Sequence, residues 1–171
     1  DDDLNILTHN FIEDRHARCS VLTLDGIEDM RLFEWMGEKW VIGNAISFPV
    51  HASTIMLAKL ESNQLVGQRI MESPTHSIME KNWMPFVQED ELNFLYSPNG
   101  QFLTLKEHLI ADRLDADNRL RGWSGSSCVT QSPDGRYFAI IHRRNTMEYF
   151  HLMVEYDRLG KAIWQSREFH F

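Results

Sequence analysis

The stretch Glu28–Phe33 (EDMRLF), followed by Lys39–Gly43 (KWVIG), begins a pattern that occurs three times in this chain. The second copy is Glu80–Phe86 (EKNWMPF) with Glu91–Tyr96 (ELNFLY), and the third is Gly122–Ser127 (GWSGSS) with Arg136–His142 (RYFAIIH). Each copy has a polar cluster, an apolar strand, a tight turn and a second strand rich in aromatic residues. The polar clusters, which start at Glu28, Glu80 and Gly122, lie 52 and 42 residues apart, about the length of a four-stranded propeller blade. A repeat of this length built only of strands predicts a β-propeller.

Short apolar runs bounded by turn residues cover most of the chain, and no window shows a strong helical period. The best helical window, Leu105–Leu114, is short. Turn signals such as SPNG at 97–100 and SPDG at 132–135 separate the runs. We therefore expect an all-β fold with strands at Cys19–Leu24, Met30–Trp35, Trp40–Ile46, Thr54–Leu60, Gln68–Met71, Met84–Val87, Leu92–Tyr96, Ser127–Thr130, Tyr137–His142 and Tyr149–Tyr156.

We expect residues 1–171 to form a single, partial β-propeller domain: about three four-stranded blades plus strands of a fourth, from a five-bladed ring. The expected divisions are 1–25 for the end of a preceding blade, then 26–75, 76–118 and 119–171 for three blades. Three blades cannot close a ring, and an open ring would expose a blade face. The missing blades are expected from a longer chain or another copy. The alternative is a β-sandwich in which the similarity of the three copies is accidental.

Composition and charge exclude several classes of function. The net charge of −8, with scattered Lys and Arg, argues against nucleic acid as the main partner. No apolar run approaches the roughly 18 residues of a membrane span, so no membrane partner is expected. Cys19 and Cys128 are far apart and form no C-x-x-C pair, which argues against a disulfide framework. The compartment stays open, with the cytoplasm favoured because a reducing environment suits such cysteines.

Three familiar kinds of catalytic or cofactor site are also missing from the sequence. The segment Gly122–Ser126 lacks the final glycine of a nucleophile elbow. The eight histidines form neither a His-x-His nor a His-Glu-x-x-His pattern, so no metal site is expected. No glycine-rich phosphate loop of the P-loop or Rossmann type occurs, so no nucleotide cofactor is expected.

The polar clusters of the three copies are expected to meet in space. The first strand of a propeller blade lines the central channel, so each blade donates one or two side chains to a shared pocket there. The side chains expected in that pocket are Asp29, Arg31, Lys81, Asn82, Ser124 and Ser126. Their charged and polar groups suit a polyhydroxylated ligand, and the rings of Trp35, Trp83 and Trp123 could stack on sugars. Two plainer interpretations remain open: Trp83 and Trp123 pack between blades, and Asp29 forms a salt bridge with Lys81.

The same segments resemble a known family. Gly26–Phe33 resembles the Glu-Asp-Pro-Arg signature of the five-bladed mannoside phosphorylase family of glycoside hydrolases, with Met30 at the usual proline. Glu80–Phe86 resembles a second block of that family, and Gly122–Ser127 with Tyr137–His142 resembles a third. The chain is most similar to the propeller domains fused to bacterial and viral glycosyltransferases, in which a block like Tyr149–Gly160 follows. The resemblance covers roughly residues 25 to 171.

The resemblance implies a carbohydrate or glycoside substrate and a site at the channel. It makes Asp29 the acid that protonates the glycosidic oxygen, directly or through a sugar hydroxyl. It makes Arg31, Lys81, Asn82 and His142 candidates for binding substrate hydroxyls or inorganic phosphate, which would be a co-substrate rather than a cofactor.

The number of carboxylates separates the possible reactions. A hydrolase needs two carboxylates, which Asp29 and Glu80 could supply, whereas a phosphorylase needs only one protein acid. The third cluster has no acid, which favours phosphorolysis, glycosyl transfer or no catalysis. The alternative function is a non-catalytic sugar-binding or scaffold propeller associated with a glycosyltransferase or a larger assembly. A weaker alternative is a propeller that binds proteins.

Overall fold

The computed structural model describes residues 12, 27–47, 52–104, 109–110 and 118–171. These residues form an all-β structure that contains no α-helix and a single short 3-10 turn at Asn118–Leu120. Among the described residues, no helix has the length and apolar character needed to cross a membrane. The expected strand Cys19–Leu24 lies outside the described residues.

The first sheet, sheet A, is an antiparallel meander of β1 (Ile27–Trp35), β2 (Glu38–Ser47), β3 (Ala52–Glu61) and β4 (Gln64–Met71), in that order. The β1–β2 turn shows why this sequence makes a hairpin. Met36 and Gly37 have φ of 54° and 72°, and two consecutive positive φ angles give the turn whose twist matches that of the paired strands.

The second sheet, sheet B, has the same order along β5 (Met84–Gln88), β6 (Glu91–Ser97), β7 (Gln101–Thr104) and β8 (Leu109–Ile110). The third, sheet C, contains β9 (Ser124–Gly125), β10 (Thr130–Gln131), β11 (Tyr137–Asn145), β12 (Glu148–Tyr156) and β13 (Ala162–Gln165). Both β9 and β10 pair with β11. The first strand of sheet C is therefore made of two short segments, whereas β1 and β5 are each a single first strand.

The all-β prediction is confirmed, and most expected strands lie within observed ones. One prediction needs correction. The segment Ser127–Thr130 is not one strand, because the Ser127 hydroxyl accepts a hydrogen bond from the Ile140 amide and holds a turn between β9 and β10. Within the window 105–114, where the helical signal of the sequence is weak, the described residues Leu109–Ile110 form a strand. The short β7, β8 and β13 were missed because two to four residues carry too little alternation to detect.

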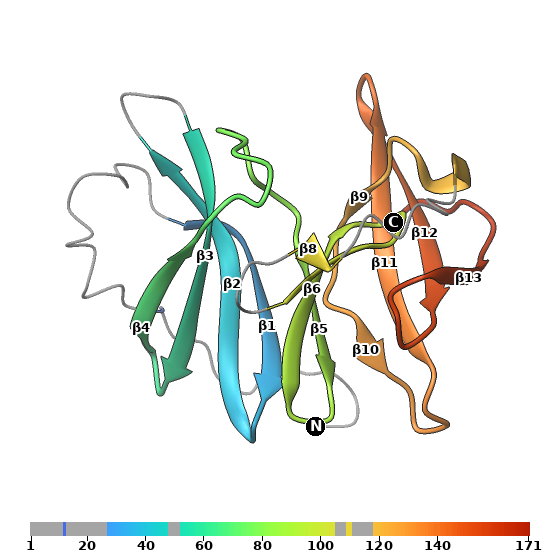
Figure 1. Ribbon diagram of the computed structural model, residues 1–171. Coiled ribbons are helices and arrows are strands. Elements are labelled where there is room, and N and C mark those ends of the chain that lie inside the picture. The colour runs from blue at the N-terminus through green and yellow to red at the C-terminus, as the bar shows by residue number, and fades with distance from the viewer. Residues whose placement is uncertain (1–11, 13–26, 48–51, 105–108, 111–117) are drawn as a thin grey trace.

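The three sheets stand side by side in the order A, B, C and pack face to face (Figure 1). Between sheets A and B lies a core that includes Ile42, Ile55, Trp83 and Phe94. Between sheets B and C lies a second core of buried residues, among them Met84, Phe86, Leu95, Tyr137, Ile141, Val154 and Tyr156. Sheet B is therefore apolar on both faces, and none of the three sheets closes on itself.

The inner ends of the sheets are also joined by backbone hydrogen bonds. The Val129 amide donates to the Pro85 carbonyl at 2.8 Å, which joins the segment before β10 to β5. Ser53, on β3, donates through its amide to the Ile78 carbonyl and accepts from the Glu80 amide at 2.7 Å. These bonds fix the segments that enter each sheet, where the polar clusters of the sequence lie.

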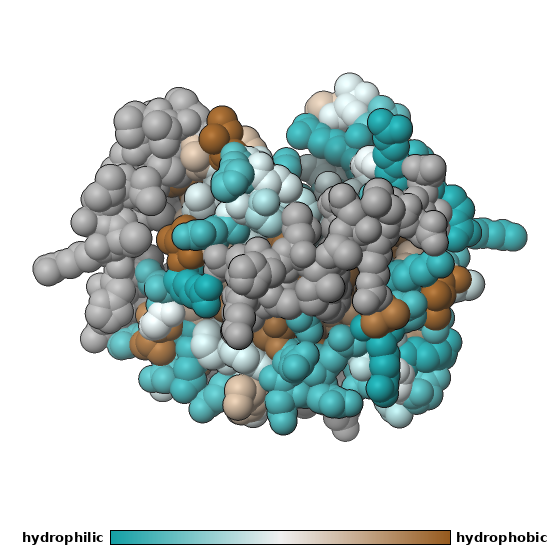
Figure 2. Space-filling model, in the orientation of Figure 1, coloured by the Kyte–Doolittle hydropathy of each residue, from teal (hydrophilic) through white to brown (hydrophobic). Residues whose placement is uncertain are grey.

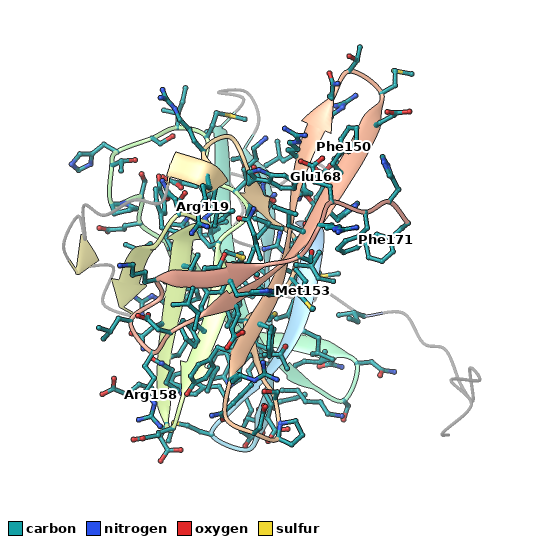
Figure 3. The ribbon with its side chains drawn as sticks, turned by 90° about the vertical axis from the view of Figure 1, so that its right-hand side faces the viewer. Arg119, Phe150, Met153, Arg158, Glu168 and Phe171 are labelled. Atoms are coloured by element: carbon teal, nitrogen blue, oxygen red, sulfur yellow. The ribbon has the colours of Figure 1, made fainter. Side chains whose placement is uncertain are left out.

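The last residues of the chain are attached to sheet C. Arg143 forms an ion pair with Glu168, in which Nη2 donates to both carboxylate oxygens, at 2.8 and 2.9 Å. His151 and Phe169 exchange two backbone hydrogen bonds, and the Phe169 ring stacks on the His151 imidazole. Figure 3 shows Phe150, Glu168 and Phe171 grouped at one end of β12, with Met153 further along the sheet. The C-terminal residues Glu168–Phe171 therefore lie next to His151 on β12.

Candidate functional site

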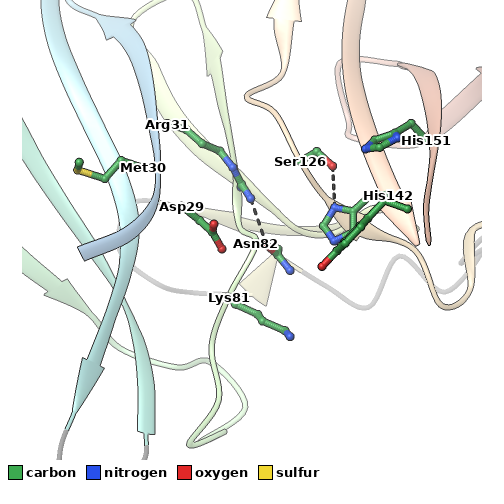
Figure 4. Close-up of a pocket in the computed structure, with 9 residues that line it drawn as sticks. Asp29, Met30, Arg31, Lys81, Asn82, Ser126, His142 and His151 are labelled. Carbon is green, nitrogen blue, oxygen red and sulfur yellow. Dashed lines mark hydrogen bonds between the residues drawn. The ribbon is translucent and has the colours of Figure 1, made fainter. Parts of the chain in front are cut away.

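An open pocket lies where the first strands of the three sheets meet (Figure 4). Its volume is about 470 Å³, within the range of small-molecule sites. The residues that line it are Asp29, Met30, Arg31, Lys81, Asn82, Ser126, His142, Tyr149 and His151. Six of them were expected from the sequence to face a common pocket or ligand. The space-filling view shows the surface notched between the part that holds sheets A and B and the β11–β12 hairpin (Figure 2).

Two of the lining residues hold unusual backbone conformations. Asp29 has φ of 51° and lies in β1 where the pairing register with β2 shifts between Glu28 and Arg31. Asn82 has φ of 63° just before β5. Positive φ is uncommon outside glycine, although Asp and Asn tolerate it best, and such positions cluster at functional sites. The bulge changes the alternation of side chains along β1 at the point where Asp29 and Arg31 both border the pocket.

Arg31 connects the three sheets. Its Nη1 donates to the Trp83 carbonyl at 2.9 Å, and its Nη2 donates to Asn82 Oδ1 at 3.2 Å and to the Gly125 carbonyl at 3.1 Å. Burial is the main cause that lowers its pKa, against the raising effect of Cys128 and Asp29. Three of the five guanidinium N–H groups are therefore used within the protein, and the remaining two limit what Arg31 can offer a ligand.

Gly125 allows the first strand of sheet C to approach sheet B closely. A Cβ at this position would lie 2.4 Å from Met84 Cγ and 2.5 Å from the Asn82 carbonyl oxygen. Real Cβ atoms essentially never come that close, so glycine is required here. The contact places Ser126, the next residue, opposite Lys81 and Asn82 in the pocket.

His142 and Ser126 form the sheet C side of the pocket. The Ser126 hydroxyl lies 2.7 Å from His142 Nδ1, and the imidazole packs against the ring of Tyr149 with centroids 5.5 Å apart. Burial lowers the pKa of His142, and the neighbouring His151, Arg31 and Lys81 lower it further, whereas Asp29 opposes them. The imidazole is therefore neutral at pH 7.

Asp29 is the one carboxylate among the described residues that line the pocket. No ion pair joins it to Lys81, so the salt bridge considered from the sequence does not form between these two described residues. One acid surrounded by guanidinium, ammonium, amide and imidazole groups suits a ligand rich in oxygen acceptors.

Glu80 lies outside the pocket. Its side chain is buried and accepts hydrogen bonds from Trp83 Nε1 at 2.9 Å, the Tyr96 hydroxyl at 3.0 Å and the Ser73 hydroxyl at 2.5 Å. A carboxylate so occupied has no approach to a ligand held by Asp29. The structure does not bring Asp29 and Glu80 together as a pair facing one space.

The remaining expected residues, Ser124 and three tryptophans, do not line the pocket. Ser124 is half-buried in β9, paired in register with His142, and does not line the pocket. Trp83 is buried between sheets A and B, and Trp123 between sheets B and C beneath the Arg143 guanidinium. Trp35 packs against the first of these cores and donates through its indole N–H to the Asp90 carbonyl at 2.9 Å. Trp83 and Trp123 therefore pack between sheets and do not line the pocket.

Three lining residues were missed from the sequence: Met30, Tyr149 and His151. The hairpin of β11 and β12 could have indicated the last of these. His142 and His151 are directly opposite in its antiparallel register, and opposite residues point to the same side of a sheet. The ring nitrogen Nδ1 of His151 is buried and has no hydrogen-bond partner among the described residues.

Comparison with models of protein families, with curated proteins and with solved structures found no match to this chain.

Proposed function

We propose that the three sheets are consecutive blades of a β-propeller, and that the pocket among their first strands binds a carbohydrate and acts on its glycosidic bond. Three features support the propeller: each sheet is a meander of about four strands, the sheets pack face to face, and their first strands meet at one place. Repeated sheets arranged in this way form a shared axial site.

One observation carries the proposal. Residues far apart in the sequence, from three copies of a repeat, line one pocket: Asp29, Arg31, Lys81, Asn82, Ser126 and His142. Nothing in sheet packing alone requires each repeat to place polar groups at the same point. The positive φ angles of Asp29 and Asn82 add to this, because backbone strain is retained where the position of a side chain matters.

The reaction that best suits the pocket is phosphorolysis of a mannoside-type bond. Asp29 donates a proton to the glycosidic oxygen while a phosphate oxygen attacks the anomeric carbon. The carbon–oxygen bond to the leaving sugar breaks, the proton that the phosphate loses on attack restores the Asp29 acid, and the products are a sugar 1-phosphate and a sugar hydroxyl. Phosphate supplies the nucleophile, so one protein acid is sufficient, and Lys81 with the free N–H groups of Arg31 offsets the phosphate charge. Hydrolysis would need a second carboxylate.

The proposed ring needs further blades, supplied by a longer chain or by another copy. The second candidate function is sugar binding without catalysis, in a scaffold associated with a glycosyltransferase or a larger assembly. It is favoured by the same shortage of carboxylates, since Glu80 is committed to the core.

The substitution Asp29→Asn separates these functions. We expect it to abolish turnover of β-mannoside disaccharides with inorganic phosphate while leaving their binding within a few-fold, because asparagine keeps the size but cannot donate the acid proton. The matched control is Glu28→Gln, an exposed neighbouring carboxylate that does not line the pocket. Phosphate release or consumption and isothermal calorimetry give the two readouts. A wild type that binds mannosides without turnover supports the scaffold, and one that neither binds nor converts them refutes both.

A further inference from the structure

We propose that Ser126 is a positioning residue: its hydroxyl donates a hydrogen bond to Nδ1 of His142, which fixes the ring and leaves the imidazole proton on Nε2, where it is a donor to the pocket. The inference rests on the proposed function for its ligand, but the hydrogen bond can be tested without one. It gives Ser126 a role different from the direct substrate contact expected from the sequence.

The direction of the hydrogen bond follows from its length and from the partners of the hydroxyl. The Oγ–Nδ1 distance is 2.7 Å, which is in the usual range for a bond donated by O–H and at the short end of the range, about 2.7 to 3.2 Å, for one donated by N–H. If Nδ1 carried the proton instead, the Ser126 hydroxyl would need another acceptor. No described residue accepts a hydrogen bond from the Ser126 hydroxyl other than His142.

Ser126 can hold the ring because its own backbone is fixed. The amides of Ser126 and Ser127 both donate to the Ile140 carbonyl, at 3.0 and 3.2 Å. The Ser127 hydroxyl accepts from the Ile140 amide at 2.9 Å and donates to the Cys128 carbonyl at 2.8 Å. The turn after β9 is thereby joined to β11 two residues before His142, so the hydroxyl and the imidazole keep a constant spacing.

The imidazole has one proton to place. Burial and the charges of Arg31 and Lys81 disfavour the doubly protonated form, so the neutral ring has one donor nitrogen and one acceptor nitrogen. With Nδ1 accepting from Ser126, Nε2 carries the hydrogen. Nε2 has no hydrogen-bond partner within the described part of the chain, and Figure 4 shows the far edge of the ring turned away from Ser126.

A fixed Nε2–H completes a consistent arrangement of donors. Arg31, Lys81 and Asn82 also line the pocket and carry N–H donors, so a protonated Nε2 of His142 would add one more donor for the oxygen atoms of a ligand. An acceptor nitrogen at that place would instead require a ligand hydroxyl to turn its proton toward His142. The hydroxyl of Ser126 therefore selects which edge of a sugar or phosphate group is bound there.

The test uses ¹⁵N-histidine-labelled protein at pH 8, where nitrogen shifts separate a protonated ring nitrogen from an unprotonated one. The His142 signals are assigned by their absence in His142→Gln. We expect an unprotonated, hydrogen-bonded Nδ1 and a protonated Nε2 in the wild type. In Ser126→Ala, Nδ1 should move to the position of an unprotonated nitrogen without a hydrogen bond. The control Thr130→Ala, which removes an exposed hydroxyl of β10 outside the pocket, should leave both signals unchanged.

Binding of a β-mannoside disaccharide, with and without inorganic phosphate, gives the second readout. Ser126→Ala should weaken it about 2- to 12-fold, the equivalent of one neutral hydrogen bond, and Thr130→Ala should not. A protonated Nδ1 in the wild type, or a Nδ1 shift that is the same in Ser126→Ala, overturns the proposal, and so does unchanged affinity in that variant. A wild type with the expected nitrogen signals that binds no mannoside refutes the proposed function but leaves the hydrogen bond established.

Discussion

Arg31 is the side chain that joins all three sheets, so its removal is the most direct test of the architecture. The substitution Arg31→Met keeps most of the apolar stem and removes the guanidinium. It leaves the carbonyls of Trp83 and Gly125 without the donors that now lie 2.9 and 3.1 Å away. It also frees the Asn82 amide oxygen, whose bond is longer at 3.2 Å.

The expected loss follows from these three bonds. A hydrogen bond to a charged group contributes about 1.5 to 3 kcal/mol, so the two carbonyl bonds alone would give roughly 3 to 6 kcal/mol. Two effects reduce this value: water in the pocket can reach the freed carbonyls, and burial of the guanidinium opposes its charge, as its lowered pKa shows. We therefore expect the free energy of unfolding to fall by about 2 to 4 kcal/mol. Arg31→Lys should lose about half as much, because one ammonium cannot span all three acceptors.

Urea unfolding followed by tryptophan fluorescence and circular dichroism measures this loss. The matched control is Arg121→Ala, an exposed arginine that should change stability by less than about 0.5 kcal/mol. If Arg31→Met costs less than about 1 kcal/mol, Arg31 does not hold the sheets together. Its guanidinium would then be available to a ligand as the sequence first suggested.

Two further predictions concern neighbours of the pocket. Gly125→Ala should destabilise the protein by about 3 kcal/mol or more in the same assay, because the added Cβ meets the Asn82 carbonyl at 2.5 Å and backbone cannot move aside cheaply; a loss no greater than that of Ser124→Ala would contradict the close approach. Glu80→Gln should reduce stability by about 1 to 3 kcal/mol, since its amide places a donor against groups that already donate, yet leave mannoside binding and turnover unchanged. Loss of turnover without loss of stability would return Glu80 to the list of catalytic candidates.

The strands could be predicted from the sequence because period-two alternation and turn residues are local signals. Tyr137–Tyr156, with its apolar alternation and the polar turn at Asn145–Glu148, forms the hairpin that this pattern indicates. The short β9 and β10 could not be predicted, because what defines them is the hydrogen bonding of Ser127 to β11, a contact between distant residues. The three-fold repeat indicated which segments enter each sheet, and the structure places those segments at one junction.

The membership of the pocket was harder to predict, because residues 80–83 precede β5 without being a strand, so their side chains do not follow the regular alternation of a strand. In the second polar cluster, Lys81 and Asn82 line the pocket, whereas Glu80 and Trp83 turn together into the core and bond to each other there. A cluster of four polar and aromatic residues therefore serves two purposes. The residue types alone cannot show which members line the pocket and which lie in the core, since Glu80 carries the same carboxylate group as Asp29.

In the first and second clusters, the residues that line the pocket lie at or near one residue with positive φ. Asp29 and Asn82 have positive φ, and in each cluster the strand that follows continues into the core between sheets. A residue in this conformation bends the chain, so that it and its immediate neighbours border the junction while the rest of the strand resumes regular pairing. In the third cluster Gly125 takes the corresponding place by permitting close approach rather than by bending. Sheet packing thus determines where the three clusters meet, and a single backbone irregularity in each determines which side chains a ligand would encounter.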